Sequence, residues 1–121
     1  MLRPGTAFDP EVVFEIDMKA DDNGSAHAIQ KHPDGTADYV RFRPDQTPMA
    51  TRWICRTPDQ EGLGVVFPAT SGVEGYTIEK AKGRGVVLDG RATWRADMGF
   101  GLLTSGETSD MIAAINRVRA G

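Results

Sequence analysis

The side chains best suited to acid–base chemistry or to holding a polar ligand fall in two regions of the sequence. The loop 68–84 contributes Glu74, Tyr76 and Lys80. The other region is a set of polar residues that alternate with apolar ones before position 43: Glu15, Asp17, Gln30, His32, Tyr39 and Arg41. Planar polar groups beside an aromatic ring can hold a sugar or a sugar phosphate. We therefore take all of these residues as candidate substrate-binding groups, and among them Glu74 and His32 as the candidate catalytic pair.

Each region also has a purely structural explanation. Antiparallel sheets commonly turn one polar face to solvent, and His32 opposite Glu15 would form a cross-strand pair that stabilises a sheet. The loop 68–84 could be a surface excursion with one helical turn over 77–82, although long loops in small domains often carry function.

The sequence contains no motif typical of metal binding or of nucleophilic catalysis. His27 and His32 are five positions apart on one predicted strand, so their side chains point to opposite faces and cannot share an ion. The single cysteine, Cys55, excludes an internal disulfide and a cysteine zinc cage. Neither a Gly-x-Ser-x-Gly elbow nor a His-Glu-x-x-His helix occurs. We expect no metal and no cofactor.

Three strands are predicted to position the polar set. Apolar residues alternate from Val12 to Met18, and Asn23-Gly24 then gives a strong hairpin signal. Strand 25–32 runs into a second turn at Asp34-Gly35, which leads to strand 37–43.

If both turns are two-residue loops, the residue numbers of cross-strand partners add up to 47 in the first hairpin and to 69 in the second. Met18 would face Ile29, and Ile29 would face Val40. One face of this three-stranded meander would then be apolar and the other polar. The predicted apolar face is Phe14, Ile16, Met18, Ile29, Val40 and Phe42, and the reverse face carries the polar set named above.

Further strands are predicted at 51–56, 62–67, 85–88 and 92–103, with Trp53 and Trp94 in the core. The period then changes to that of an amphipathic helix over 105–119, which opens with the capping-box pattern Thr104-Ser105-Gly106-Glu107. We expect one mostly β domain over 1–121, with an irregular arm at 1–9, strands within 10–103 and one C-terminal helix. The fold class is an all-β antiparallel sandwich.

Composition limits the partners. The chain has 121 residues and a formal net charge of −3, which argues against nucleic acid or an anionic membrane. Neither a signal-peptide run nor a membrane-spanning run is visible, so we expect a cytoplasmic protein.

Several segments together resemble the C-terminal part of the galactose mutarotase-like (aldose 1-epimerase) superfamily. They are Thr51-Arg52-Trp53-Ile54, Gly64-Val65-Val66-Phe67-Pro68-Ala69-Thr70, Glu74-Gly75-Tyr76-Thr77, Glu79-Lys80-Ala81-Lys82-Gly83 and Val87-Leu88-Asp89-Gly90, followed by the extended segment 92–103. The resemblance covers roughly residues 10–104 and implies part of a β-supersandwich that binds carbohydrate. It also implies that any activity would be that of an aldose 1-epimerase-like isomerase.

The sequence departs from that family in ways that bear on catalysis. The family's catalytic histidines come from an earlier portion that this chain lacks, and Pro68 and Ala69 stand where its catalytic glutamate ends the apolar strand. Epimerisation needs an oriented base and acid, and no residue of this chain matches that pair. The expectation is a carbohydrate-binding protein. The alternatives are a noncatalytic β module that oligomerises through exposed sheet edges, most simply as a homodimer, and a small cupin-like enzyme.

Overall fold

The computed structural model describes residue 3 and residues 5–121, and the chain in those ranges is mostly β. The expected irregular arm over 1–9 lies partly outside the described residues, and the first strand already begins at Phe8. In chain order the elements are β1 (Phe8–Glu15), β2 (Ala26–Lys31), β3 (Ala37–Phe42), β4 (Met49–Arg56), β5 (Glu61–Leu63), β6 (Phe67–Ala69), α1 (Tyr76–Ala81), β7 (Met98–Leu103) and α2 (Ser105–Ala120).

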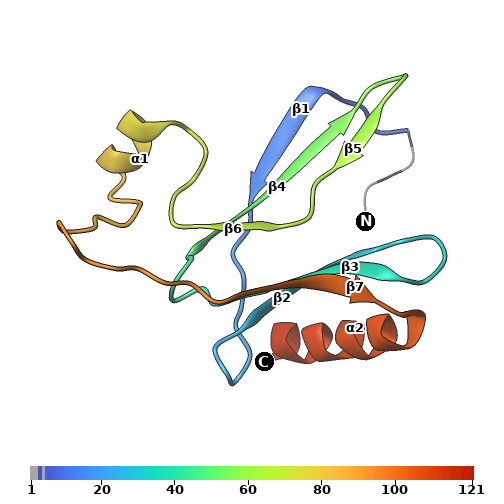
Figure 1. The fold of residues 1–121 in the computed structure, drawn as a ribbon. Helices are drawn as coiled ribbons and strands as arrows, with labels where there is room; N and C mark the ends of the chain where they lie inside the picture. The colour runs from blue at the N-terminus through green and yellow to red at the C-terminus, as the bar shows by residue number, and fades with distance from the viewer. Residues whose placement is uncertain (1–2, 4) are drawn as a thin grey trace.

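The strands form two antiparallel sheets that pack against each other (Figure 1). Sheet A has the order β1-β4-β5, with β6 also paired to β4, and sheet B has the order β2-β3-β7. This arrangement confirms the predicted sandwich-like, mostly β fold with one C-terminal helix.

The predicted hairpin between the first two strands is wrong. β1 pairs with β4 in sheet A, where Glu15 lies opposite Thr51, and not with β2. The Asn23-Gly24 turn does form, and the carboxylate of Asp21 closes it by accepting hydrogen bonds from the backbone N–H groups of Asn23 and Ser25, both at 2.9 Å. Because the chain leaves sheet A after Glu15, this turn leads into a strand of the other sheet.

The predicted register of the second hairpin is wrong by one residue. β2 and β3 do pair, but His27 lies opposite Arg41 and Ile29 opposite Tyr39. The loop has three residues rather than two, since His32 donates its backbone N–H to the carbonyl of Thr36 at 2.8 Å, and Gly35 within it has a φ of +92° that favours glycine. A one-residue shift moves every side chain of one strand to the other face.

The core between the sheets therefore differs from the predicted apolar face. Val40 and Phe42 do point into it, but Ile29 lies on the opposite face of sheet B with Tyr39, and Phe14 is exposed. The buried core cluster is Ala26, Val40, Phe42, Ala50 and Val66, with Ile16, Met18, Ala28 and Val65 packed against it.

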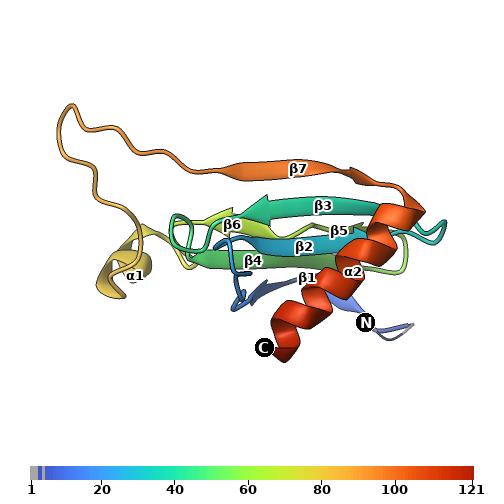
Figure 2. The same ribbon diagram turned by 90° about the horizontal axis from the view of Figure 1, so that it is seen from below.

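The C-terminal helix α2 confirms the capping-box prediction. The hydroxyl oxygen of Thr104 accepts the backbone N–H of Glu107, and the Glu107 carboxylate accepts the backbone N–H of Thr104. The helix crosses sheet B on the face turned away from sheet A, where it contacts β2 and β7 (Figure 2). The start of α2 packs closely against Gly35, since a Cβ on that glycine would lie 3.1 Å from the Cβ of Ser105.

The segment between α1 and β7 is less regular than predicted. No strand forms over 85–88, and only Met98–Leu103 of the expected strand 92–103 is a strand. Residues 86–97, here called the arm, form an extended connection along the edge of the molecule (Figure 2). Both tryptophans, expected in the core, are exposed: Trp94 lies on the arm and Trp53 on β4.

Candidate functional site

The candidate site is built around a buried carboxylate, that of Glu79 on α1. The residue is 5% exposed. One carboxylate oxygen accepts the backbone N–H of Gly72 at 2.8 Å, and the other accepts the backbone N–H of Glu74 at 3.3 Å. These two hydrogen bonds hold the loop 70–75 around the carboxylate of Glu79.

Arg84 connects this loop to sheet A. Its Nη1 and Nη2 donate to the two carboxylate oxygens of Glu15, at 3.0 and 3.3 Å. The same Nη1 lies 3.5 Å from a carboxylate oxygen of Glu79, and the backbone N–H of Arg84 donates to the carbonyl of Glu79 at 3.0 Å. The guanidinium therefore bridges the end of β1 and the buried carboxylate of α1.

Gly72 leaves the space that this arrangement needs. A Cβ at Gly72 would lie 2.7 Å from a carboxylate oxygen of Glu15, 2.8 Å from one of Glu79 and 2.9 Å from Nη1 of Arg84. All three atoms are held by hydrogen bonds, so none can move away freely. A residue with a side chain at this position would displace the ion-pair network.

The electrostatics keep these groups ionised. Burial raises the pKa of Glu79, but the hydrogen bonds from the Gly72 and Glu74 amides and the charge of Arg84 outweigh it, so the pKa lies below its ordinary value. The hydrogen bonds to Glu15 raise the pKa of Arg84. Both residues are charged at neutral pH, as an ion-pair network requires.

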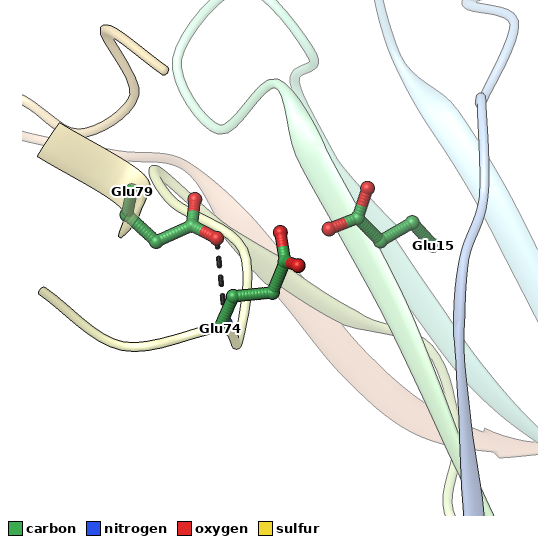
Figure 3. A group of neighbouring side chains, drawn as sticks. All are labelled: Glu15, Glu74 and Glu79. Carbon is green, nitrogen blue, oxygen red and sulfur yellow. Dashed lines mark hydrogen bonds between the residues drawn. The ribbon is translucent and has the colours of Figure 1, made fainter. Parts of the chain in front are cut away.

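Three carboxylates come together here: Glu15, Glu74 and Glu79 (Figure 3). One oxygen of each lies within 4.8 Å of the others, a spacing that a cation could bridge. Arg84 and Lys82, which pairs with Glu74, already supply two positive charges against the three negative ones. The cluster is thus largely self-neutralised, and its chemistry is that of a hydrogen-bonding surface.

A depression of about 730 Å³ adjoins this cluster. Glu79 and Arg84 line it, and so does the exposed ring of Tyr76. The ammonium group of Lys80 lies 5.6 Å from the centre of that ring. Residues 70–73 and Gly75 also line the depression, as do Val86 and Val87 of the arm. An aromatic surface next to charged hydrogen-bonding groups is suited to a small polar ligand.

The structure brings together four of the sequence-predicted site residues. Glu15 and Glu74 belong to the carboxylate cluster, and Tyr76 and Lys80 line the adjoining depression. Glu79, Arg84 and Gly72 complete this site but were not predicted, because their contacts join positions that carry no common motif.

The remaining predicted site residues are divided between other places. Gln30 and His32 lie on the face of sheet B toward sheet A, where Gln30 donates to the carbonyl of Leu63 at 3.3 Å and His32 lies 3.0 Å from Asp38. Tyr39 and Arg41 lie on the opposite face, and Asp17 lines a separate cavity beside α2. The predicted single polar face is therefore wrong.

The candidate catalytic pair is also separated. Glu74 lies in the loop before α1, whereas His32 lies in the hairpin between β2 and β3, at the opposite end of the molecule (Figure 1). The two histidines lie on opposite faces of sheet B, as their spacing predicts. The two histidines therefore cannot bind the same metal ion, as the cupin-like alternative would require.

A second polar group surrounds His27. Its Nδ1 lies 2.7 Å from the hydroxyl of Tyr39 and its Nε2 lies 2.8 Å from a carboxylate oxygen of Asp21. The hydrogen bond with His27 lowers the pKa of Asp21, and burial raises the pKa of Tyr39. Since every polar atom of the ring has a partner, this chain of contacts fixes the turn at 21–25 onto sheet B.

Comparisons of the chain with protein-family models, with curated proteins and with solved structures find no match. Within the described ranges, neither helix has the length and apolar character needed to cross a membrane.

Proposed function

We propose that this protein binds carbohydrate, as a free sugar or a sugar phosphate, in the depression beside Glu79 and Arg84. The observation that carries the proposal is the exposed Tyr76 ring next to a fixed set of carboxylate and guanidinium groups. Sugars present an apolar ring face and a rim of hydroxyls, which match an aromatic surface flanked by hydrogen-bonding groups. The resemblance of segments 51–103 to mutarotase-like proteins points to the same ligand class.

The groups around the depression divide this work between them. The Tyr76 ring offers a stacking surface, and Lys80 beside it offers a cation for a phosphate or a hydroxyl. The exposed carboxylate of Glu74, in the adjoining cluster and paired with Lys82, can accept further hydrogen bonds from hydroxyls. Arg84 and Glu79 act mainly by holding the loop 70–75 in place, because their own hydrogen bonds are directed to each other, to Glu15 and to the backbone.

We propose binding without turnover. Epimerisation requires an acid and a base positioned around one sugar ring. The candidate pair Glu74 and His32 lies at two ends of the molecule, and Glu79 is committed to two backbone amides (Figure 1).

Isothermal titration with aldoses and their phosphates tests this function. We expect saturable binding by the native protein and at least a tenfold weaker affinity for Tyr76→Ala. Phe14→Ala, which removes an exposed ring on β1, is the matched control and should bind like the native protein. No heat of binding with any sugar, or equal loss in both variants, would exclude the depression as a sugar site.

A second candidate function is self-association as a β module, most simply a homodimer. The specific observation in its favour is the exposed apolar surface of β7 and the arm. Sedimentation equilibrium over a wide range of concentrations tests it. A single species of 13.1 kDa at every concentration would contradict it.

A further inference from the structure

β7 has one free hydrogen-bonding edge. Among the described residues it pairs with β3 on one side only, and sheet B ends with it. Such an edge presents unpaired backbone N–H and C=O groups that can pair with another strand. Proteins usually protect free edges with charges, prolines or bulges. The sequence of β7, Met-Gly-Phe-Gly-Leu-Leu, contains no charged residue and no proline.

The side chains of β7 form an uncovered apolar stripe. Met98, Phe100 and Leu102 are 38%, 67% and 75% exposed. Through their partners on β3 they lie on the face of sheet B that carries Val40 and Phe42. Those two β3 residues are buried between the sheets, whereas β7 lies at the outer edge of sheet B (Figure 2). The stripe thus extends the apolar, core-facing side of sheet B to the free edge of that sheet, where no described part of sheet A covers it.

The arm extends this apolar surface. Val87 is 94% exposed, and Val86, Leu88 and Trp94 are between 43% and 53% exposed. A hydrogen bond from the backbone N–H of Asp97 to the side chain of Gln46, at 2.8 Å, connects the β7 end of the arm to the turn between β3 and β4. The exposed apolar side chains of the arm and β7 together amount to roughly 700 Å². That area is close to the roughly 800 Å² that each partner contributes to a standard protein interface.

We propose that β7 pairs antiparallel with β7 of a second copy of this chain, about a twofold axis. Sheet B would become one six-stranded sheet, and the apolar stripes of the two copies would join on one face. This inference rests on the proposed self-association and assigns the surface that carries it.

A second copy fits this edge better than a different partner, for two reasons. An uncharged strand can lie beside its own copy without like-charge repulsion, and an antiparallel pair of identical strands closes after two chains. Alternation along β7 puts Met98, Phe100 and Leu102 on one face and Gly99, Gly101 and Leu103 on the other, so the two stripes meet on the same side of the joined sheet. The arms, which continue from β7, can then cover the stripe of the other copy.

The test compares the dimer affinity of the full-length chain with that of two variants by sedimentation equilibrium. Phe100→Glu puts a charge into the centre of the stripe on both copies, and we expect at least a 100-fold weaker dimer. Val13→Glu is the matched control, since Val13 is also an exposed apolar strand residue but lies on β1 in sheet A. We expect its dimer affinity to be unchanged.

Hydrogen exchange on the native protein supplies a readout that needs no variant. The β7 amides that point away from β3 should be protected at high protein concentration and lose that protection on dilution, while the amides that bond β3 to β7 stay protected. A dimer that tolerates Phe100→Glu and leaves those outward-pointing β7 amides unprotected would overturn the β7 interface but leave self-association standing. A native chain that is monomeric at every concentration overturns both. Binding of β7 to a different protein, with no dimer, would also overturn the inference.

Discussion

Arg84 holds the carboxylate of Glu15 with both terminal nitrogens, across 69 positions of sequence. Glu15 is the last residue of β1, and Arg84 follows α1, so this contact fastens the loop of the candidate site to sheet A. Two-point contacts of this kind fix direction as well as distance. The position of the depression relative to the sandwich therefore depends on a pair that spans most of the chain.

Replacing Arg84 by lysine should loosen the candidate site while the sandwich stays folded. Lysine keeps the charge but cannot make the two-point contact with Glu15 or reach Glu79 at the same time. We expect faster amide hydrogen exchange at Gly72 and weaker sugar binding, with core amides of β3 and β4 unaffected. Arg95→Lys, on the arm, is the control that should change neither measurement.

Replacing Gly72 by alanine should destabilise the protein by about 1–3 kcal/mol, as overpacking does. The new methyl group would lie within 3 Å of Glu15, Glu79 and Arg84 and would force their network apart. Gly90→Ala has no atom within 4 Å of the added Cβ and should cost little. Urea unfolding of both variants measures the difference. Equal stability of the two would show that the network tolerates displacement.

Lowering the pH should reduce the free energy of unfolding, because Glu79 becomes protonated. Its pKa in the folded state lies below the ordinary value of 4.5, so the unfolded chain binds the proton more tightly. The carboxylate therefore contributes stability that is fully present above pH 4.5 and lost as the pH falls through the folded-state pKa. Unfolding curves between neutral and acidic pH should show this loss, and Glu79→Gln should reduce its size. An unchanged acid profile in Glu79→Gln would contradict the assignment.

A further prediction concerns the hydrophobic core, where Phe42 lies between the sheets and is 1% exposed. Phe42→Ala should cost about 3–5 kcal/mol, because it removes buried apolar surface and leaves a cavity. Phe14→Ala makes the same chemical change at an exposed position and should cost far less. Thermal unfolding of the two variants compares them. A similar loss in both would mean that the sheets do not pack as described.

Local sequence patterns predicted the features that depend on neighbouring residues. The capping box of Thr104 and Glu107 and the helix after it follow from a four-residue motif, and both form as predicted. Turn residues also marked the two turns correctly. The number of residues in the loop before Thr36 was not determined, because Pro33-Asp34-Gly35 suits a two-residue or a three-residue loop. That single residue decides whether Ile29 and Val40 share a face, and in the structure they lie on opposite faces.

Pairing between distant segments was not predictable in the same way. The alternation over β1 is equally compatible with β2 and with β4 as partner, and the chain uses β4. For the site, sequence reasoning named Glu74 and Tyr76 because their residue types stood out in a long loop. It did not find Glu79 as the central residue, since the burial of its carboxylate depends on where the amide of Gly72 lies.

The most direct test of the proposed function is an NMR titration of the ¹⁵N-labelled protein with the tightest-binding aldose or aldose phosphate. The account predicts saturable shifts concentrated at the amides of 70–76 and the side chain of Arg84, with amides around His27 and His32 unchanged. Shifts confined to the cavity beside α2 that Asp17 and His27 line, or to the hairpin after β2, or no saturable shift with any sugar, would contradict it.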